Sequence, residues 1–499
     1  MMRDLIYIQL VAFLIVSGCA TNNGSQDIPD RPEKLVFPEL KYEPPVGADY
    51  RVQLKGGPVA YLVPSTELPL VSISISVRTG KYVVPRGKEG LAAAAGGLLA
   101  SAGTKGRTAE ALQERLAFLA ARLGSSVGEN SGSVSLNMLS KDLDEGMAIL
   151  REVLTEPRFQ QDRLDLFKTQ QLSGMKQRND DSRGLEGRNL LRLGYGEHFF
   201  RNWLPTKASI ESLTQDDLKA FHRDWFHPAN FVVAVSGDFE RADMTARLEK
   251  LFAKWPFKGK PARAVPTNKT FAKPGIYFVN KDVNQGRVTI LLNGITRDNP
   301  DYYAIQVMND ILGGGGFTSR ITNRVRSDEG LAYSAYSVFP GGTYFSRTFV
   351  AGFQSKSRTV LYATSIVLEE IRKIAATGVT DKEMATAKNS FIQTFPQAFA
   401  TKGQVAGTFA GEEFTGRGKV DPAYFKNYRA KVAAVTKADV QRVAKKYLDP
   451  AKVVILITGN KQEILKGHPD HPIKLQTLSK GPLTDLPLRD PLTLKPLAE

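Results

Sequence analysis

The chain has one cysteine in 499 residues, Cys19, and only five histidines and three tryptophans. A single thiol cannot form a disulfide within the chain, so the packed core must supply the stability. The sequence also contains no CxxC pair, no phosphate-cradling loop and no nucleophile turn of the kind that carries a catalytic serine. These absences argue against dithiol redox, nucleotide and serine-hydrolase chemistry.

A dense basic run is also missing, although the formal net charge is +16 and the isoelectric point is near 9.6. Lysine and arginine are spread along the whole chain without interleaved aromatic residues, which argues against nucleic-acid binding. Two interpretations of the charge remain open. It can be a solvated basic surface, or it can attract an acidic substrate, an acidic partner or an anionic envelope surface.

The only long apolar run lies at the N-terminus, over residues 6–16, and is followed by Ser17, Gly18 and Cys19. It is too short for a confident membrane span and is typical of an export signal. Small residues before a lone cysteine resemble the lipobox of bacterial lipoproteins. This resemblance implies a signal peptide over 1–18, lipid attachment to Cys19, and, because residue 20 is alanine, an outer-membrane lipoprotein facing the periplasm. The alternative is a plain signal peptide with a chance cysteine.

An internal repeat organises the rest of the chain. The segment 213–238 aligns without a gap to the segment 435–460. Both predict a helix that begins with a capping box, carries apolar residues on one face and is followed by a buried β-branched strand ending in glycine. Four pairs match at a constant offset of 222: Thr214 with Thr436, Asp217 with Asp439, Pro228 with Pro450, and Gly237 with Gly459.

The repeat is far too long for a solenoid and indicates two homologous domains. Alternating strands are expected at 71–80 and 133–139, and amphipathic helices at 141–159 and 357–378. The second half is also expected to contain a helix at 302–312 and a strand at 343–353. We therefore predict an α+β fold of two homologous α/β domains, each a mostly antiparallel sheet packed with helices. The predicted boundaries are a lipidated tether at 19–47, domains at 48–257 and 275–460 joined by a linker at 258–274, and an extended, proline-rich tail at 461–499.

Several motifs resemble the insulinase/pitrilysin metallopeptidase family, in particular its mitochondrial-processing-peptidase type. They are GLA at 90–92, GT at 103–104, RTAE at 107–110 and LGGGGFTSRITNRVRSDEGLAYS at 312–334. The similarity covers about residues 48–460 and implies half of a clamshell peptidase. Active members carry His-x-x-Glu-His directly after GLA, which places two histidines on one helix face to bind zinc, with the glutamate as general base.

The zinc motif is absent here, because its three positions are Ala93, Gly96 and Gly97. Residues 91–106 contain no histidine, aspartate or glutamate, and residues 166–179, where a further glutamate ligand is expected, contain no carboxylate. We expect no cofactor in this chain, and zinc only in a partner subunit. Glycine is a poor helix former, so we interpret Gly96 and Gly97 as selected for smallness, on a helix that packs closely against a neighbour and lines a chamber.

Two residues of the second half keep the family pattern, Arg326 and Tyr333. The resemblance implies that they reach the substrate carbonyl at the zinc of another lobe, donated in trans by a metal-less chain. The alternative is structural, with Arg326 paired to a carboxylate and Tyr333 packed. For the glycine-rich loop we keep three interpretations: a tightly packed turn, a peptide-contacting loop or a phosphate site. Its residues are Gly313, Gly314, Gly315 and Gly316.

These observations predict a non-catalytic subunit that forms a heterodimer with a zinc-bearing insulinase-family chain. It would hold unfolded peptide by strand addition, assist its cleavage at the cell envelope and attach to the membrane through its lipid. One alternative is a peptide-binding or scaffolding lipoprotein without an active partner, another is an enzyme with an unrecognised site, and a third is a homodimer. None of the histidines is expected to build a metal centre: His198, His222, His227, His468 and His471.

Overall fold

The computed structural model describes residues 30–31, 34–35 and 41–497. The predicted signal peptide, Cys19 and most of the tether lie outside the described residues. From Pro44 onward the chain forms one unit, and the following description concerns that unit.

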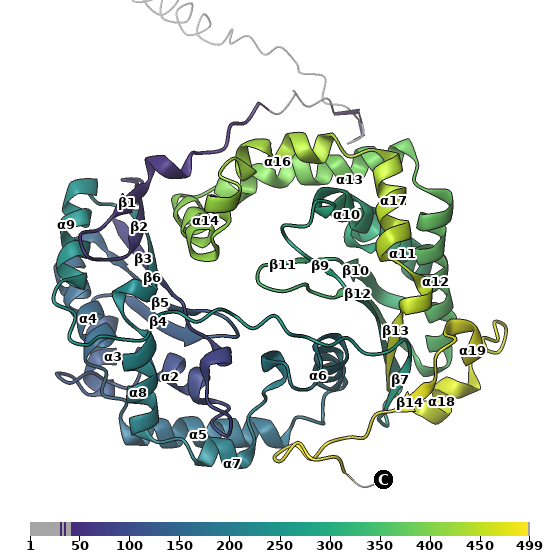
Figure 1. Cartoon of the computed structure of the whole chain (residues 1–499), viewed down its shortest axis with the longest axis horizontal. Coiled ribbons are helices and arrows are strands. Elements are labelled where there is room, and N and C mark those ends of the chain that lie inside the picture. Colours follow the sequence, from purple (N-terminus) through teal and green to yellow (C-terminus); the bar gives the residue numbers. More distant parts are fainter. Residues whose placement is uncertain (1–29, 32–33, 36–40, 498–499) are drawn as a thin grey trace, which may run out of the picture. The chain divides into compact units, whose positions relative to one another are not determined.

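Two six-stranded sheets form the framework (Figure 1). In the first sheet only β2 and β6 run parallel, and in the second sheet β7 runs parallel to both β13 and β14. All other neighbours within the two sheets are antiparallel, so the predicted α+β class with mostly antiparallel sheets is confirmed. The first sheet has the order β1 (Arg51–Gln53), β2 (Val59–Pro64), β6 (Phe231–Gly237), β3 (Leu70–Val77), β5 (Gly132–Leu139), β4 (Arg122–Val127). The second has the order β10 (Ala332–Val338), β12 (Phe349–Lys356), β8 (Gln285–Leu292), β13 (Val454–Gly459), β7 (Gly275–Asn280), β14 (Leu483–Asp485).

The internal repeat appears as two equivalent helix–strand units. Helix α8 (Gln215–Trp225) and helix α17 (Lys437–Tyr447) begin 222 residues apart. Thr214 and Thr436 cap them with complete capping boxes, as predicted. Strands β6 and β13 follow the two helices and lie third and fourth in their respective sheets, and both are almost entirely buried. The duplicated fold is therefore confirmed.

Helices cover both sheets. In the first half they are α2 (Leu91–Leu99), α3 (Ala109–Phe118), α4 (Leu143–Thr155), α5 (Gln161–Lys176), α6 (Ser182–Tyr195), α7 (Lys207–Glu211), α8 and α9 (Arg241–Phe252). In the second half they are α10 (Tyr302–Asn309), α11 (Arg320–Thr322), α12 (Val360–Thr377), α13 (Asp381–Thr394), α14 (Lys402–Thr415), α15 (Arg417–Val420), α16 (Tyr424–Ala433), α17, α18 (Lys461–Lys466) and α19 (Leu475–Leu478). Two further short strands, β9 (Ile295–Thr296) and β11 (Gly341–Gly342), pair with each other. The apolar faces predicted for α4 and α12 are buried, since each has an apolar residue at every turn.

Three segments differ from the sequence-based expectation. The helix predicted over 302–312 continues beyond α10 as a π-helical turn, Asp310–Gly314. Residues 343–348 are not part of a strand, because Phe345 packs into the core of the first half, edge-on to Phe199. The tail is not simply extended: it forms α18 and α19 and contributes β14 to the second sheet.

The two halves exchange helices. Helix α14 of the second half packs on β2 and β6 of the first sheet. There Phe409 stacks on Tyr50 and Tyr61, and Glu413 accepts hydrogen bonds from Tyr61 and Arg51, both at 3.1 Å. In return, α6 of the first half packs on β8 and β13 of the second sheet. Residues 258–274, between the two halves, contain no helix or strand.

Candidate functional site

Helix α2 holds the three positions where the metal motif is expected. Ala93 and Gly97 lie one turn apart and are both exposed, so they share the open face of the helix. Gly96 is buried where the helix packs against β4. A Cβ atom at Gly96 would lie 2.2 Å from the backbone nitrogen of Val127. The position of the catalytic glutamate is therefore closed to any side chain unless β4 moves.

Gly96 and Gly97 differ in how closely the neighbouring elements approach them. Gly96 permits the close helix–strand approach that its small size predicted. At Gly97, a Cβ atom would have no neighbouring atom within 4 Å, so close approach does not explain this glycine. The interpretation that both residues were selected for contact is thus right for Gly96 and wrong for Gly97.

A groove of about 640 Å³ borders the open face of α2; we call it the α2 groove. It lies between α2, α3, β4 and the start of α5, and no histidine, cysteine or carboxylate lines it. Its main apolar side chains are Leu98, Leu112, Leu116, Leu123, Leu166 and Phe167. Arg122 and Arg163 are its charged residues. Within the described part of the chain, no group of three or more histidine, cysteine, aspartate or glutamate residues is placed to hold a metal ion. The groove suits apolar segments with acidic flanks.

Strand β4 forms the edge of the first sheet beside this groove. Gly128 N donates to Ser131 O at 2.8 Å. Because hydrogen-bonded pairs alternate along an antiparallel ladder, the backbone N–H and C=O groups of Leu123, Ser125 and Val127 point toward the free edge of the sheet. Helix α2 covers part of that edge: the Ser125 hydroxyl donates to Gly96 O at 2.6 Å and accepts from Ala100 N at 3.0 Å. The end at Leu123 borders the α2 groove.

Arg326 and Tyr333 come together in the structure. The Arg326 guanidinium lies over the Tyr333 ring at 4.6 Å and over the Phe317 ring at 4.5 Å. Both rings are exposed, Tyr333 by 84% and Phe317 by 64%. Among the residues that the structure describes, no carboxylate pairs with Arg326 and no hydrogen bond uses its N–H groups. The two rings thus fix the guanidinium plane and leave its donor edge free.

Phe317 was missed by sequence reasoning, although it lies inside the quoted motif. An aromatic residue between the glycine run and a helix start is an ordinary packing signal, and only its exposure marks it. We call Phe317, Arg326 and Tyr333 the aromatic–arginine stack.

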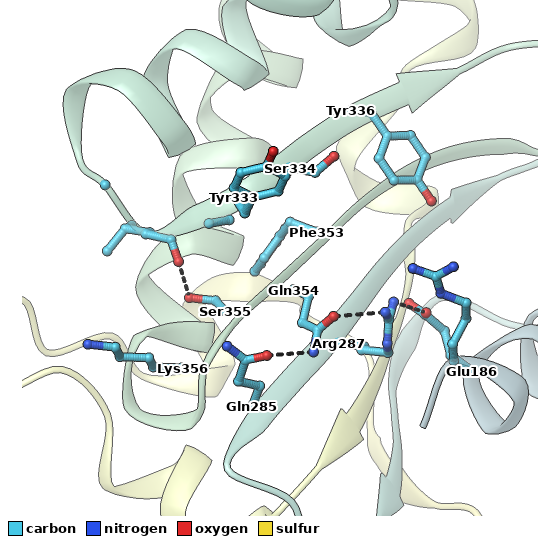
Figure 2. A pocket seen from close by; sticks show the side chains of 14 residues that line it. Glu186, Gln285, Arg287, Tyr333, Ser334, Tyr336, Phe353, Gln354, Ser355 and Lys356 are labelled. Carbon is cyan, nitrogen blue, oxygen red and sulfur yellow. Dashed lines mark hydrogen bonds and ion pairs between the residues drawn. The ribbon is translucent and has the colours of Figure 1, made fainter. Parts of the chain in front are cut away.

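Tyr333 also borders a pocket of about 560 Å³ between β8, β10, β12 and the start of α6 (Figure 2). One wall is a polar chain: Arg287 donates to Glu186 at 3.2 Å and to Gln354 at 2.8 Å, and Gln354 donates to Gln285 at 2.7 Å. Burial raises the pKa of Glu186, although the hydrogen bonds from Thr289 and Arg287 oppose the shift. Glu186 comes from the first half, and no local pattern signals its pairing across 101 residues.

The glycine-rich loop is chiefly a packed turn. A Cβ at Gly313 would lie 2.5 Å from Ser337 N, and one at Gly314 would lie 2.7 Å from the Asn309 amide. Gly316 has a φ of +59°, the left-handed region that favours glycine. The loop thereby seats the α10–α11 region against the edge strand β10, where the side chains of Gln306, Asn309 and Thr322 donate to the carbonyls of Phe339, Ser337 and Ala335.

The histidines have individual roles. His222 is buried, its ring bonds to Leu154 O at 2.9 Å, and burial lowers its pKa to about 4. His227 bonds to Lys260 O at 2.8 Å, and His198 is exposed. His468 and His471 lie against the ring of Tyr362, with His471 stacked at 4.3 Å.

Comparisons with known proteins agree with this geometry. Residues 212–391 match the protein family described as "Peptidase M16 inactive domain". A "non-peptidase homolog YmxG" from Helicobacter pylori is 28% identical over 338 residues, which cover 66% of this chain and 76% of the relative. A probable mitochondrial-processing peptidase subunit beta from Arabidopsis thaliana is 21% identical over 383 residues, covering 72% of this chain and 69% of the relative. The crystal structure of a peptidase M16 inactive domain from Pseudomonas fluorescens matches with a TM-score of 0.73 at 25% identity, over 82% of this chain and 97% of that one.

The duplicated sheets give the chain a peptidase-like fold, in which the expected metal-binding positions of α2 carry no ligand residues. More narrowly, the chain is similar to insulinase-like, M16-type proteins, inactive members among them, over residues 212–391 and over the length of the relatives given above. The matched family is described as inactive, and one relative is named a non-peptidase homolog, whereas a relative from Mycobacterium leprae is named an uncharacterized zinc protease. In the part of the chain that the structure describes, no helix has the length and apolar character to cross a membrane.

Proposed function

We propose that this chain is a non-catalytic subunit that binds unfolded peptide and assists a zinc-bearing insulinase-family partner in proteolysis. The observation that carries the proposal is a contrast between two sites. At α2 the metal-binding positions are Ala93 and Gly97, and Gly96 leaves no room for a glutamate. At the aromatic–arginine stack Tyr333 is exposed, and no residue in the described part of the chain accepts a hydrogen bond from the Arg326 guanidinium. In this proposal the capacity to bind a metal ion is absent at α2, and the capacity to donate hydrogen bonds to a substrate carbonyl is retained at Arg326 and Tyr333.

The retained pair suits the stabilisation of an oxyanion. A guanidinium edge and a phenol both donate hydrogen bonds, and donors fixed before the reaction stabilise charge that develops on a peptide carbonyl oxygen. Arg326 and Tyr333 themselves supply neither a metal ion nor a general base, so this proposal places the activation of water at a partner's zinc site. This proposal therefore assigns Arg326 and Tyr333 to a partner's active site.

The α2 groove supports peptide binding. Its apolar walls can take the side chains of an extended segment, while the edge of β4 near Leu123 can add the segment's backbone to the first sheet. Arg122 at the groove would favour acidic residues in that segment, whereas Arg163 already pairs with Glu110. The name of the Arabidopsis relative, a subunit of a processing peptidase, supports the assignment to an assembly. The export signal and Cys19 support a location at the cell envelope, anchored by lipid.

The test is co-purification of the native chain, followed by peptide-cleavage assays with and without the partner it brings. We expect a chain with His-x-x-Glu-His, cleavage only by the complex, and zinc only in the partner. Arg326→Ala and Tyr333→Phe should each lower turnover on the order of 100-fold without dissociating the complex. Arg372→Ala, at an exposed position of α12, is the matched control and should leave turnover unchanged.

Three outcomes would contradict the proposal: cleavage by the isolated chain, about one zinc per isolated chain, or unchanged turnover in both variants. Peptide binding without any metallopeptidase partner would instead support the alternative function, a peptide-binding or scaffolding lipoprotein.

A further inference from the structure

The C-terminal segment 486–497, here called the strap, connects the two halves. It leaves the second sheet where Leu486 N donates to Phe278 O at 2.7 Å. It then lies on the first half, where the Arg178 guanidinium donates to Pro491 O and the Asn179 amide donates to Arg489 O, both at 2.8 Å. Figure 1 shows this yellow segment running from β14 toward the end of the chain.

Four arginines line one small pocket beneath the strap. They are Arg178 from the α5–α6 turn, Arg188 and Arg192 from α6, and Arg489 from the strap itself. The pocket holds about 20 Å³ and is lined otherwise by asparagine, leucine and proline side chains. Guanidinium groups cannot shed their proton near neutral pH, so the pocket carries four positive charges.

The negative charge around these arginines is insufficient. Glu197 lies 2.7 Å from Arg489 and 4.0 Å from Arg192, and it is the carboxylate in direct contact with the cluster among the described residues. Asp181, at the start of α6, acts on Arg188 only from a longer distance. The remaining acceptors are neutral: Arg188 donates to Arg178 O, and Arg489 donates to Leu494 O at 3.2 Å.

Burial makes this imbalance costly. Burial and then the neighbouring arginine lower the pKa of Arg178 and of Arg192 to about 10 each. Two other half-buried arginines each have a carboxylate partner: Arg287 pairs with Glu186, and Arg320 pairs with Glu383. The strap cluster stands apart because its charges converge on a shared pocket.

We propose that this pocket binds a small inorganic anion of chloride size. A single water molecule needs a cavity volume of about 10–15 Å³, and this pocket has about 20 Å³. It therefore accepts a single-atom anion and is too small for a tetrahedral phosphate. A spherical anion can accept N–H bonds from several guanidinium groups at once. It would neutralise part of the charge and join the strap to α6, so that anion binding stabilises the contact between the two halves.

The experiment combines crystallography and unfolding of the full-length chain. Crystals soaked in bromide should show an anomalous peak in the pocket between Arg188, Arg192 and Arg489. At constant ionic strength, replacing gluconate by chloride should raise the unfolding temperature by about 2–4 °C in a saturable way. Arg192→Gln should abolish the peak and the rise, and Arg372→Gln should keep both.

Arg188→Lys, which conserves the charge, provides a second variant in case Arg192→Gln does not fold. The proposal is overturned if wild-type crystals show no bromide in the pocket, an ordered water only, or if the unfolding temperature is equal in chloride and gluconate. It is also overturned if phosphate stabilises the chain as much as chloride at the same ionic strength, because that would indicate general screening. This inference stands apart from the proposed function.

Discussion

The close contact between α2 and β4 leads to a quantitative prediction about two adjacent glycines. A methyl group added at Gly96 would meet Val127 N at 2.2 Å, Ser126 C at 2.7 Å and Val127 Cγ2 at 2.9 Å. Backbone atoms cannot rotate away, so the helix and the strand must separate. Overpacking of this kind costs about 1–3 kcal/mol, whereas alanine regains about 1 kcal/mol of helix propensity. The net expectation for Gly96→Ala is a loss of about 0–2 kcal/mol.

Gly97→Ala is the matched control. It has the same change in helix propensity but meets no atom within 4 Å, so it should stabilise the protein by about 0.5–1 kcal/mol. The two variants should therefore differ by roughly 2 kcal/mol, which corresponds to about 4–8 °C in unfolding temperature for a half of this size. Calorimetry and urea unfolding measure the difference. Equal midpoints, or a Gly96→Ala variant more stable than Gly97→Ala, would refute the argument from close approach.

The same geometry governs any attempt to restore the metal motif. Ala93→His with Gly97→His should fold like the wild type, because both positions are open. Adding Gly96→Glu should lower the unfolding temperature sharply, since its stem would enter β4. A stable triple variant that binds zinc would show that β4 can move.

Three further predictions concern buried groups. Burial lowers the pKa of His222 to about 4 in the folded state, so the contribution of the neutral ring to stability is present above pH 6.5 and is lost as pH falls toward 4. The loss amounts to about 3 kcal/mol of unfolding free energy. His222→Phe should therefore flatten the dependence of the urea midpoint on pH over that range, and an unchanged dependence would contradict the prediction. Burial raises the pKa of Asp310 to about 6, so its contribution is lost as pH rises from 3.8 through 6, and Asp310→Asn should be more stable than the wild type at about pH 7 but not at about pH 3.5 in the same assay. Phe409→Ala should cost about 3–5 kcal/mol and expose α14 to limited proteolysis, because Phe409 holds that helix on the first sheet; an uncut α14 would show that other contacts suffice.

Local signals predicted much of the fold. The capping boxes at Thr214 and Thr436 and the buried strands after them were readable because cap, helix face and strand all lie within one short stretch of the chain. The same holds for α12, whose C-terminal cap Gly378 has a φ of +72°. Two copies of one pattern at a fixed offset then implied two similar sheets.

Long-range partners could not be read in this way. The sequence around Phe409 does not indicate that α14 packs on the sheet of the other half, and the sequence around Glu186 does not indicate that its partner is Arg287. The sequence alone shows that the expected zinc-ligand positions carry alanine and glycine. Which of the two glycines contacts a neighbouring strand depends on the position of β4, which the sequence does not show. Likewise, the motif singled out Arg326 and Tyr333, while their contact with each other and with Phe317 required coordinates.

The side chains that bond to the carbonyls of β10 have a consequence for solubility. An uncovered outer strand invites another molecule to extend the sheet, which is a common route to aggregation. Here Gln306, Asn309 and Thr322 occupy acceptors along one margin, and the chain's own tail adds a three-residue strand at the opposite margin. Both edges of the second sheet are therefore protected against pairing with the strand of another molecule.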